Sequence, residues 1–515
     1  MGNSPHIALI HILDDDSLLN IFYIYRPAIF DGDKDYDARI GGGAEWDRER
    51  WWYKLAQVCR RWRILILESP SYLSLCLVCT YGTPVADMLA HSPPLPLVID
   101  FFRGYRDVTA EDEEGIILAL EQRHRVRHVR LQMPILKMQK LIMAVDEEYP
   151  MLEYLVMEPP NDDKSSALML PETLQAPHLR HLMLVDFVLP IRSRLLTTAV
   201  SLVTLALYME SPSVYFQPNA LLYWLSFMPQ LETLVISFVF HVPNRDVERQ
   251  PMQTPILTHV TPPNLRCFEF HGVSTYLEAV LCRITTPRLE TLCIRFFNQI
   301  TVSIPSLVQF VNTTENIGFD GVIFQFYREK VYAGMFSRAE PQVFPLHIKI
   351  PCWHLDWQVS SVAQIFNSLN QISSTVEHLT FRHEVHSLSS EEHNEVDRSE
   401  WRKLLRSFSN VKTLQVDDGL VNELSHSLRL DDGDLPLDLL PELQEITYSG
   451  SGDLDTGDAF TSFIDARQNA GRPVTLVRPN SRSLTPLSRS SSPRLLESPH
   501  AIPAGSSKAG NDLDS

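Results

Sequence analysis

Apolar residues in the first 75 positions follow a helical period in two stretches. The first stretch places four residues at positions i, i+3, i+4 and i+7, on one face of a helix: Leu18, Ile21, Phe22 and Tyr25. Aspartates at positions 14–16 precede it and supply carboxylates that favour a helix start. The second stretch repeats the spacing: Leu55, Val58, Cys59 and Trp62. Between the two, residues 31–50 mix acids, bases and a run of three glycines, which predicts a loop.

Beyond residue 120 a different pattern recurs, of the form Leu-x-x-Leu-x-Leu with other apolar residues replacing some leucines. The clearest copies begin at Leu152, Leu179, Leu202, Leu231, Leu265, Leu289, Val376, Val411 and Leu443, and a weaker copy begins at Val126. The last three residues of each copy alternate as a short strand does, and the first leucine folds the entering turn into the same core. Neighbouring copies begin about 23 to 35 residues apart, close to the spacing of leucine-rich repeats.

The intervals between copies leave room for helices. Residues 221–228 and 397–408 have helical spacing of apolar positions. The interval 305–375 lacks the full motif, but residues 322–326 and 346–350 alternate as strands and residues 362–369 have a helical pattern. We interpret this interval as degenerate repeats of the same kind.

From residue 479 the chain is rich in Ser, Pro and Arg and contains few apolar residues. Such a segment cannot bury enough apolar surface to offset the entropy lost on folding. The sequence therefore predicts an α/β protein in four parts. These are a helical module (1–75), a connecting segment that caps the repeats (76–120), an irregular leucine-rich-repeat-like solenoid (121–478) and a disordered tail (479–515).

Composition narrows the class of protein. The formal net charge is -18 at pH 7, which argues against a nucleic-acid binder, because such a protein normally needs a basic face. No apolar run is long enough to span a bilayer, and the start of the chain lacks the pattern of a signal peptide. Seven cysteines in 515 residues fit reduced thiols better than a disulfide framework. We expect an intracellular protein with no membrane partner.

Candidate catalytic and metal-binding residues are weak. Cys76 and Cys79 form a Cys-x-x-Cys pair without a second ligand pair, and we interpret them as structural thiols. His124 and His128 are four residues apart but lack the glutamate of a metalloprotease motif. No nucleophile elbow, phosphate-binding loop or dinucleotide fingerprint occurs. The sequence thus predicts no catalytic residues, no cofactor and no metal.

Residues 58–62 read Val-Cys-Arg-Arg-Trp, and the helix before them carries Leu18-Leu19 and Ile21-Phe22. This pair of motifs resembles the F-box family. Further matches are Leu13, Asp16, Leu55, Leu65, Ser69, Pro70 and Tyr72, whereas Asp14 stands where the family usually has proline. The resemblance is closer still to F-box proteins expanded in mushroom-forming basidiomycete fungi, in which a Trp-Tyr-Lys-Leu sequence, here residues 52–55, precedes the second motif.

The resemblance implies a function. In the family, the helical module docks on a Skp-type adaptor, which links it to a cullin, and the repeats select a client protein for ubiquitination. Carried over to this chain, the adaptor-binding residues would be Leu18, Leu19, Phe22, Val58 and Trp62. The implied protein is a non-catalytic substrate receptor of a ubiquitin ligase. A repeat module that binds partners with no ligase attached is the alternative, and an unrecognised enzyme is a third.

The client would bind the strand face opposite the core. Residues between the core positions of each motif point away from the core, because side chains alternate along a strand. Five of these positions form the predicted client surface: His181, Arg295, His378, Arg382 and Asp417. Loops at the edges of the repeats are the rival location.

Overall fold

The computed structural model describes twelve segments of the chain: residues 13–25, 51–102, 107–145, 147–160, 167–239, 259–297, 302–314, 316–340, 343–383, 398–429, 438–449 and 459–477. The predicted loop at 31–50 and the predicted tail at 479–515 lie outside these residues.

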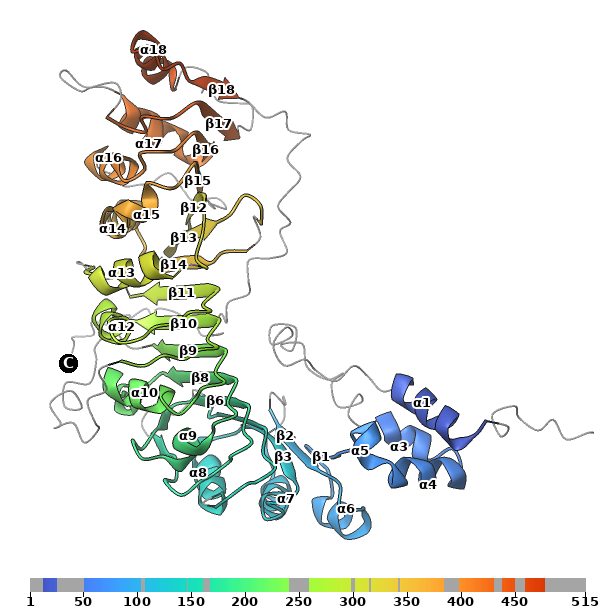
Figure 1. Cartoon of the computed structure of the whole chain (residues 1–515). Coiled ribbons are helices and arrows are strands. Elements are labelled where there is room, and N and C mark those ends of the chain that lie inside the picture. Colours follow the sequence, from blue (N-terminus) through green and yellow to red (C-terminus); the bar gives the residue numbers. More distant parts are fainter. Residues whose placement is uncertain are drawn as a thin grey trace, which may run out of the picture.

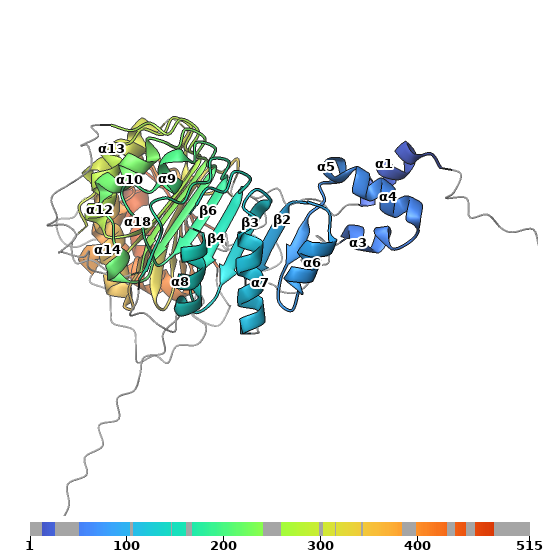
Figure 2. The same cartoon turned by 90° about the horizontal axis from the view of Figure 1, so that it is seen from below.

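Four helices of the described segments belong to the N-terminal module, which lies beyond the first strand of the sheet (Figures 1 and 2): α1 (Asp15–Tyr25), α3 (Trp51–Ala56), α4 (Arg60–Glu68) and α5 (Pro70–Leu73). Asp14 caps α1, because its carboxylate accepts a hydrogen bond of 2.7 Å from the Ser17 backbone N–H, and this bond lowers the pKa of Asp14. Trp52 ties the module to the sheet through a 3.2 Å hydrogen bond from its indole N–H to the Cys76 carbonyl.

Sixteen strands form one sheet: β1 (Leu77–Cys79), β2 (Leu97–Phe101), β3 (Val126–Gln132), β4 (Tyr154–Glu158), β6 (His181–Val185), β8 (Thr204–Met209), β9 (Thr233–Phe238), β10 (Cys267–Gly272), β11 (Thr291–Phe296), β12 (Gly321–Phe326), β13 (Lys330–Phe336), β14 (Leu346–Pro351), β15 (His378–His383), β16 (Thr413–Asp417), β17 (Glu445–Ser449) and β18 (Thr475–Val477). Two short strands pair separately, β5 (Leu168–Met169) with β7 (Phe187–Val188). The nine strands predicted from the clear motif copies are confirmed. The sheet starts earlier than we expected, because β1 and β2 fall in the segment assigned to a cap.

Helices connect the strands and lie on one face of the sheet (Figures 1 and 2). They are α6 (Val85–His91), α7 (Ala110–Leu120), α8 (Ile135–Ala144), α9 (Arg194–Thr198), η3 (Pro212–Val214), α10 (Pro218–Leu225), α12 (Ser274–Leu281), α13 (Pro305–Thr313), α14 (Leu355–Ser368), α15 (Asn370–Ser373), α16 (Arg398–Arg406), α17 (Asp418–Leu428) and α18 (Thr461–Asn469). The helices predicted near residues 221–228, 362–369 and 397–408 correspond to α10, α14 and α16.

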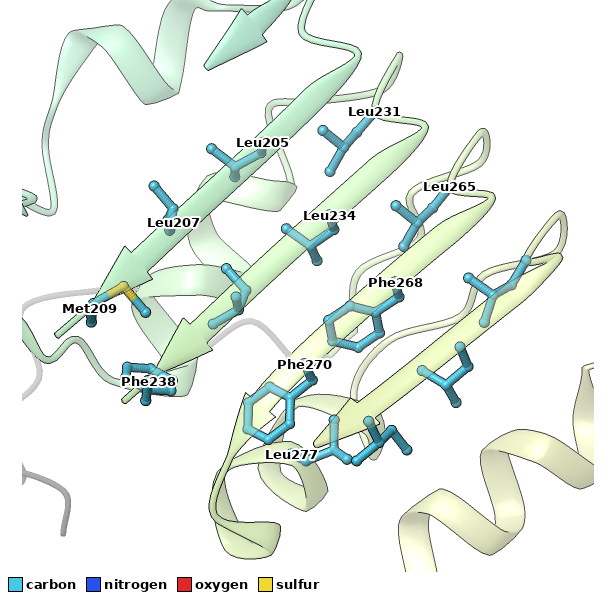
Figure 3. Packing of buried hydrophobic residues seen from close by; sticks show 14 of the residues in the cluster. Leu205, Leu207, Met209, Leu231, Leu234, Phe238, Leu265, Phe268, Phe270 and Leu277 are labelled. Atoms are coloured by element: carbon cyan, nitrogen blue, oxygen red, sulfur yellow. The ribbon is translucent and has the colours of Figure 1, made fainter. Parts of the chain in front are cut away.

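The repeat motif builds the core in layers. Leu205, Leu234 and Phe268 are in register on β8, β9 and β10, and each is fully buried (Figure 3). The leading leucine of a copy is also buried and closes a turn. The Leu179 backbone N–H, for example, donates to the Ala176 carbonyl at 3.0 Å. Each repeat thus stacks its apolar residues on those of its neighbours, as a solenoid requires.

The interval 305–375 departs from our prediction of degenerate repeats. The sheet order there is β11-β14-β13-β12-β15. After β11 the chain therefore skips two positions to form β12, and β13 and β14 then occupy the two positions between β12 and β11. The two pairings of β13 are antiparallel, whereas all other pairings in the sheet are parallel. Alternation of apolar residues predicted β12 and β14 but not β13, and it could not give their reversed order.

Candidate protein-interaction surfaces

Aromatic pairs and an arginine join the helices of the module, and the closest of these aromatic pairs links α1 to α4. The rings of Phe22 and Trp62 meet edge to face with centroids 4.8 Å apart. Arg61 reaches α1 from α4, and its guanidinium bonds the Asp15 carboxylate at 2.7 Å and the Leu13 carbonyl at 2.7 Å. These contacts join two segments that are far apart in the sequence.

The Val-Cys-Arg-Arg-Trp motif can be explained residue by residue. Cys59 is the N-cap of α4, where its sulfur accepts a hydrogen bond from the Trp62 backbone N–H. Arg61 and Trp62 make the contacts to α1. Arg63, which follows the motif, donates to the Ala56 carbonyl at 2.9 Å. Val58 has no such role, since its side chain is 59% exposed.

The five residues predicted to bind an adaptor therefore divide into two groups. Leu18 and Phe22 are buried inside the module, so they are the members of the set that hold the module together. Leu19 and Trp62 are half-buried, and Val58 lies on the surface. Sequence periodicity could not separate these groups, because seven of the eight residues from Leu18 to Tyr25 are apolar.

The module also exposes apolar residues that our prediction left out of the adaptor-binding set. Ile21, Ile24 and Tyr25 share one face of α1 at i, i+3 and i+4, and Ile24 is 81% exposed. Ile64 and Tyr72 are exposed on α4 and α5. Seven of the seventeen exposed large hydrophobic side chains of the described chain lie in the module. The sequence signal for those on α1 is the nearly continuous apolar run of residues 18–25, which places apolar side chains on more than one helix face.

The predicted client residues all lie on the sheet face opposite the core. His181, Arg295, His378, Arg382 and Asp417 are each half-buried at positions that alternate with core residues.

Two of these residues have close neighbours across the strands. The ring of His181 lies 5.6 Å from that of Tyr154, which in turn lies 5.8 Å from His128. His378 Nδ1 lies 2.7 Å from Thr413 Oγ1.

Strand register places two predicted client residues in one row across the sheet. Arg295 pairs with Lys349, which pairs with Tyr332, and the row continues through Gln325 to Arg382. Four strand spacings separate the two arginines, about 19 Å. Lys349 and Tyr332 were missed, because the order of β12, β13 and β14 was not predicted.

Beside this row the open face carries buried titratable groups. His347 Nδ1 lies 3.1 Å from the Tyr332 hydroxyl, and Cys293 pairs in register with His347. Burial lowers the pKa of His347 to about 4, although a hydrogen bond with the Phe344 backbone raises it, and burial raises the pKa of the Cys293 thiol. Both groups are therefore neutral at pH 7, and neither is an activated nucleophile or base.

Within the described segments, His, Cys, Asp and Glu side chains do not gather in threes as a metal site needs. All seven cysteines are free thiols, and Cys79 of the Cys-x-x-Cys pair is fully buried in the core. None of the described helices is long and apolar enough to cross a bilayer.

Comparison with known proteins leaves the family open. No protein-family model and no curated protein matches the chain. A solved structure of the leucine-rich-repeat protein LegL7 from Legionella pneumophila aligns with 78% of this chain and 99% of its own, at 11% identity and a TM-score of 0.26. The Rad7–Elc1 complex of yeast aligns with 90% of this chain and 92% of the matched chain, at 11% identity and a TM-score of 0.25. Both TM-scores are low, so the class of fold rests on the chain's own topology: an α/β solenoid with an N-terminal helical module.

Proposed function

We propose that this chain is a non-catalytic substrate receptor, in which the helical module docks on a Skp-type adaptor of a cullin ubiquitin ligase and the open face of the sheet binds a client protein. The observation that carries the proposal is the apolar surface of the module. Ile24, Tyr25 and Val58 are each more than half exposed on helices whose sequence resembles the F-box motif.

Exposed apolar side chains on so small a module support docking. Isolated hydrophobic residues on a surface are common, but a concentration of them on a few short helices marks an interaction site. A helical partner groove would remove Ile21, Ile24 and Tyr25 from water together, since they share one helix face.

Ile24→Asp tests the docking surface. Because Ile24 is 81% exposed, the substitution should leave the module folded, yet it would place a charge in the dry part of an interface. We expect binding of purified Skp-type adaptor to weaken at least about tenfold. The matched control is Met143→Asp, an apolar position on α8 that is 78% exposed.

Equal adaptor binding by wild type and Ile24→Asp would show that the exposed face of α1 is not the adaptor-docking surface. Failure of the wild-type chain to bind any Skp-type adaptor would favour a repeat module with no ligase attached.

The row through Arg295 and Arg382 is the proposed centre of client binding. Clients identified by proximity labelling with the wild-type chain should bind Arg295→Glu/Arg382→Glu more weakly, because the double change reverses two charges on one row. Adaptor binding should not change. Arg192→Glu/Arg194→Glu, at two exposed arginines outside the open face, is the control. Normal client binding by the first double variant would contradict the assignment.

A further inference from the structure

Two tryptophans are exposed beside the carboxyl end of β14. Trp353 is 61% exposed and Trp357 is 52% exposed. The other described tryptophans are buried or half-buried: Trp51, Trp52, Trp62, Trp224 and Trp401. Tryptophan has the largest side chain, and two of them in water represent a large unfavourable apolar area.

The reversed strands build the scaffold for this pair. Cys352 directly follows β14, and its side chain is buried in the core. Its backbone N–H donates to the Glu329 carbonyl at 2.9 Å. Gln358, on the first turns of α14, is 2% exposed and donates from Nε2 to the carbonyls of Tyr327 and Cys352, both at 2.8 Å. These bonds fasten the β12–β13 turn to the start of α14, so the tryptophans lie on a fixed frame.

The same edge carries aromatic and basic groups. The rings of His354 and Trp357 lie 5.2 Å apart, edge to face. The Lys330 ammonium lies 5.0 Å from the centre of the Tyr327 ring. Arg328 is exposed at the turn between β12 and β13. Lys330 pairs with Pro351 of β14, and Lys349 lies two residues before Pro351 on the same strand.

Charge at this edge differs from that of the whole chain. Residues 327–330 and 349–357, which the pairing of β13 with β14 brings together, contain three bases and two acids and so carry a net charge of +1, whereas the chain carries a net charge of -18. A carboxylate would therefore be attracted to this edge and repelled elsewhere.

We propose that this edge surface, formed by Tyr327, Arg328, Lys330, Trp353, His354 and Trp357, docks a partner protein through a segment that carries carboxylates next to a large apolar side chain. The indoles bury the apolar side chain and the bases meet the carboxylates. Trp, Tyr and Arg are the residue types that dominate binding energy at protein interfaces. The proposal goes beyond the receptor function, because neither the helical module nor the client-binding residues Arg295 and Arg382 belong to this surface.

A single-stranded nucleic acid also binds aromatic and basic groups. The strongly negative charge of the chain favours a peptide over a phosphate polymer, since long-range repulsion grows with the number of phosphates.

The test uses the full-length chain and defined probes. Fluorescence anisotropy would compare a dodecapeptide of alternating glutamate and leucine with a form that has lysine for glutamate, a form that has serine for leucine, and a labelled oligouridylate. We expect only the first peptide to bind well. Trp353→Ser/Trp357→Ser should weaken its binding at least about tenfold. The control is Leu136→Ser/Met143→Ser, at two exposed apolar positions of α8.

Four results would overturn the proposal. They are equal binding by the tryptophan variant and the control, equal binding of the serine or lysine peptide, tighter binding of the oligouridylate, and a wild-type dimer that the tryptophan variant converts to a monomer. The last result would assign the surface to a second copy of the chain. Adaptor binding by the tryptophan variant, measured in parallel, separates this test from that of the receptor function.

Discussion

His347 is a neutral imidazole in the interior of the open face. Its side chain is 6% exposed, and burial lowers its pKa from 6.5 to about 4. Between these two values the unfolded chain binds a proton that the folded chain does not, so stability falls as pH falls through this range. The group is a pH-dependent weak point of the fold.

We therefore expect the free energy of unfolding to drop by about 2 kcal/mol from pH 7 to pH 5 through this residue, since 1.36 kcal/mol corresponds to one unit of pKa. Urea unfolding at both pH values would measure it. His347→Asn removes the titrating group, and its stability should depend less on pH by that amount. The same pH dependence in both proteins would show that the pKa of His347 does not differ between the folded and the unfolded chain.

At the level of strands, the core positions of the motif determine stability. Leu234 is fully buried between Leu205 and Phe268 of the neighbouring strands. Leu234→Ala should lower the free energy of unfolding by about 2 to 5 kcal/mol, because it leaves a cavity that the stacked strands cannot close. Val200→Ala, at a position 53% exposed, should change it by less than about 0.5 kcal/mol. Similar losses in both variants would mean that the β9 core is not packed as described.

The second position of the motif contains a feature that the sequence analysis missed. The backbone N–H at this position donates a hydrogen bond to the backbone carbonyl at the same position of the preceding repeat. The Arg266 N–H donates to the Glu232 carbonyl and the Glu290 N–H donates to the Arg266 carbonyl, both at 2.8 Å. The side chains there often alternate in charge, and Lys412 pairs with Glu377 at 2.6 Å. Such exposed pairs contribute little energy each, but opposite charges on adjacent strands favour the observed register.

Sequence patterns predicted the strands better than their arrangement. Alternation identified Leu234 and Ile348 as core residues, because burial on one face imposes a period of two. It did not reveal β13, whose Lys330, Tyr332 and Gly334 give no clear amphipathic signal. In the module, periodicity placed Leu18 and Phe22 on the correct helix face but not in the interior, since that depends on which partner helix covers them.

Across the whole molecule, the reversed strands are the connection between two parallel arrays. Gly334 of β13 is crowded, because a Cβ atom there would lie 2.8 Å from the Tyr332 ring and 2.9 Å from Phe344. In a solenoid each repeat is stabilised by its neighbours, so weakening one connection can separate the units on its two sides.

Gly334→Val should therefore cost about 1 to 3 kcal/mol and divide thermal unfolding into two transitions. Hydrogen exchange should show β15–β18 opening independently of β1–β9. Gly318→Val is the matched control, because nothing lies within 4 Å of a Cβ at Gly318. A single transition in the Gly334 variant would show that the two arrays remain coupled.

The position of β14 in the sheet order sets how many partners can be bound at once. It is the tenth of sixteen strands, so nine spacings, about 43 Å along the sheet, separate it from β1, beside which the helical module lies. A domain of 100 residues has a radius of gyration of about 13 Å, so one such domain at the edge surface would not reach another at the module. Simultaneous occupancy is thus sterically allowed, and the two affinities should be independent of each other.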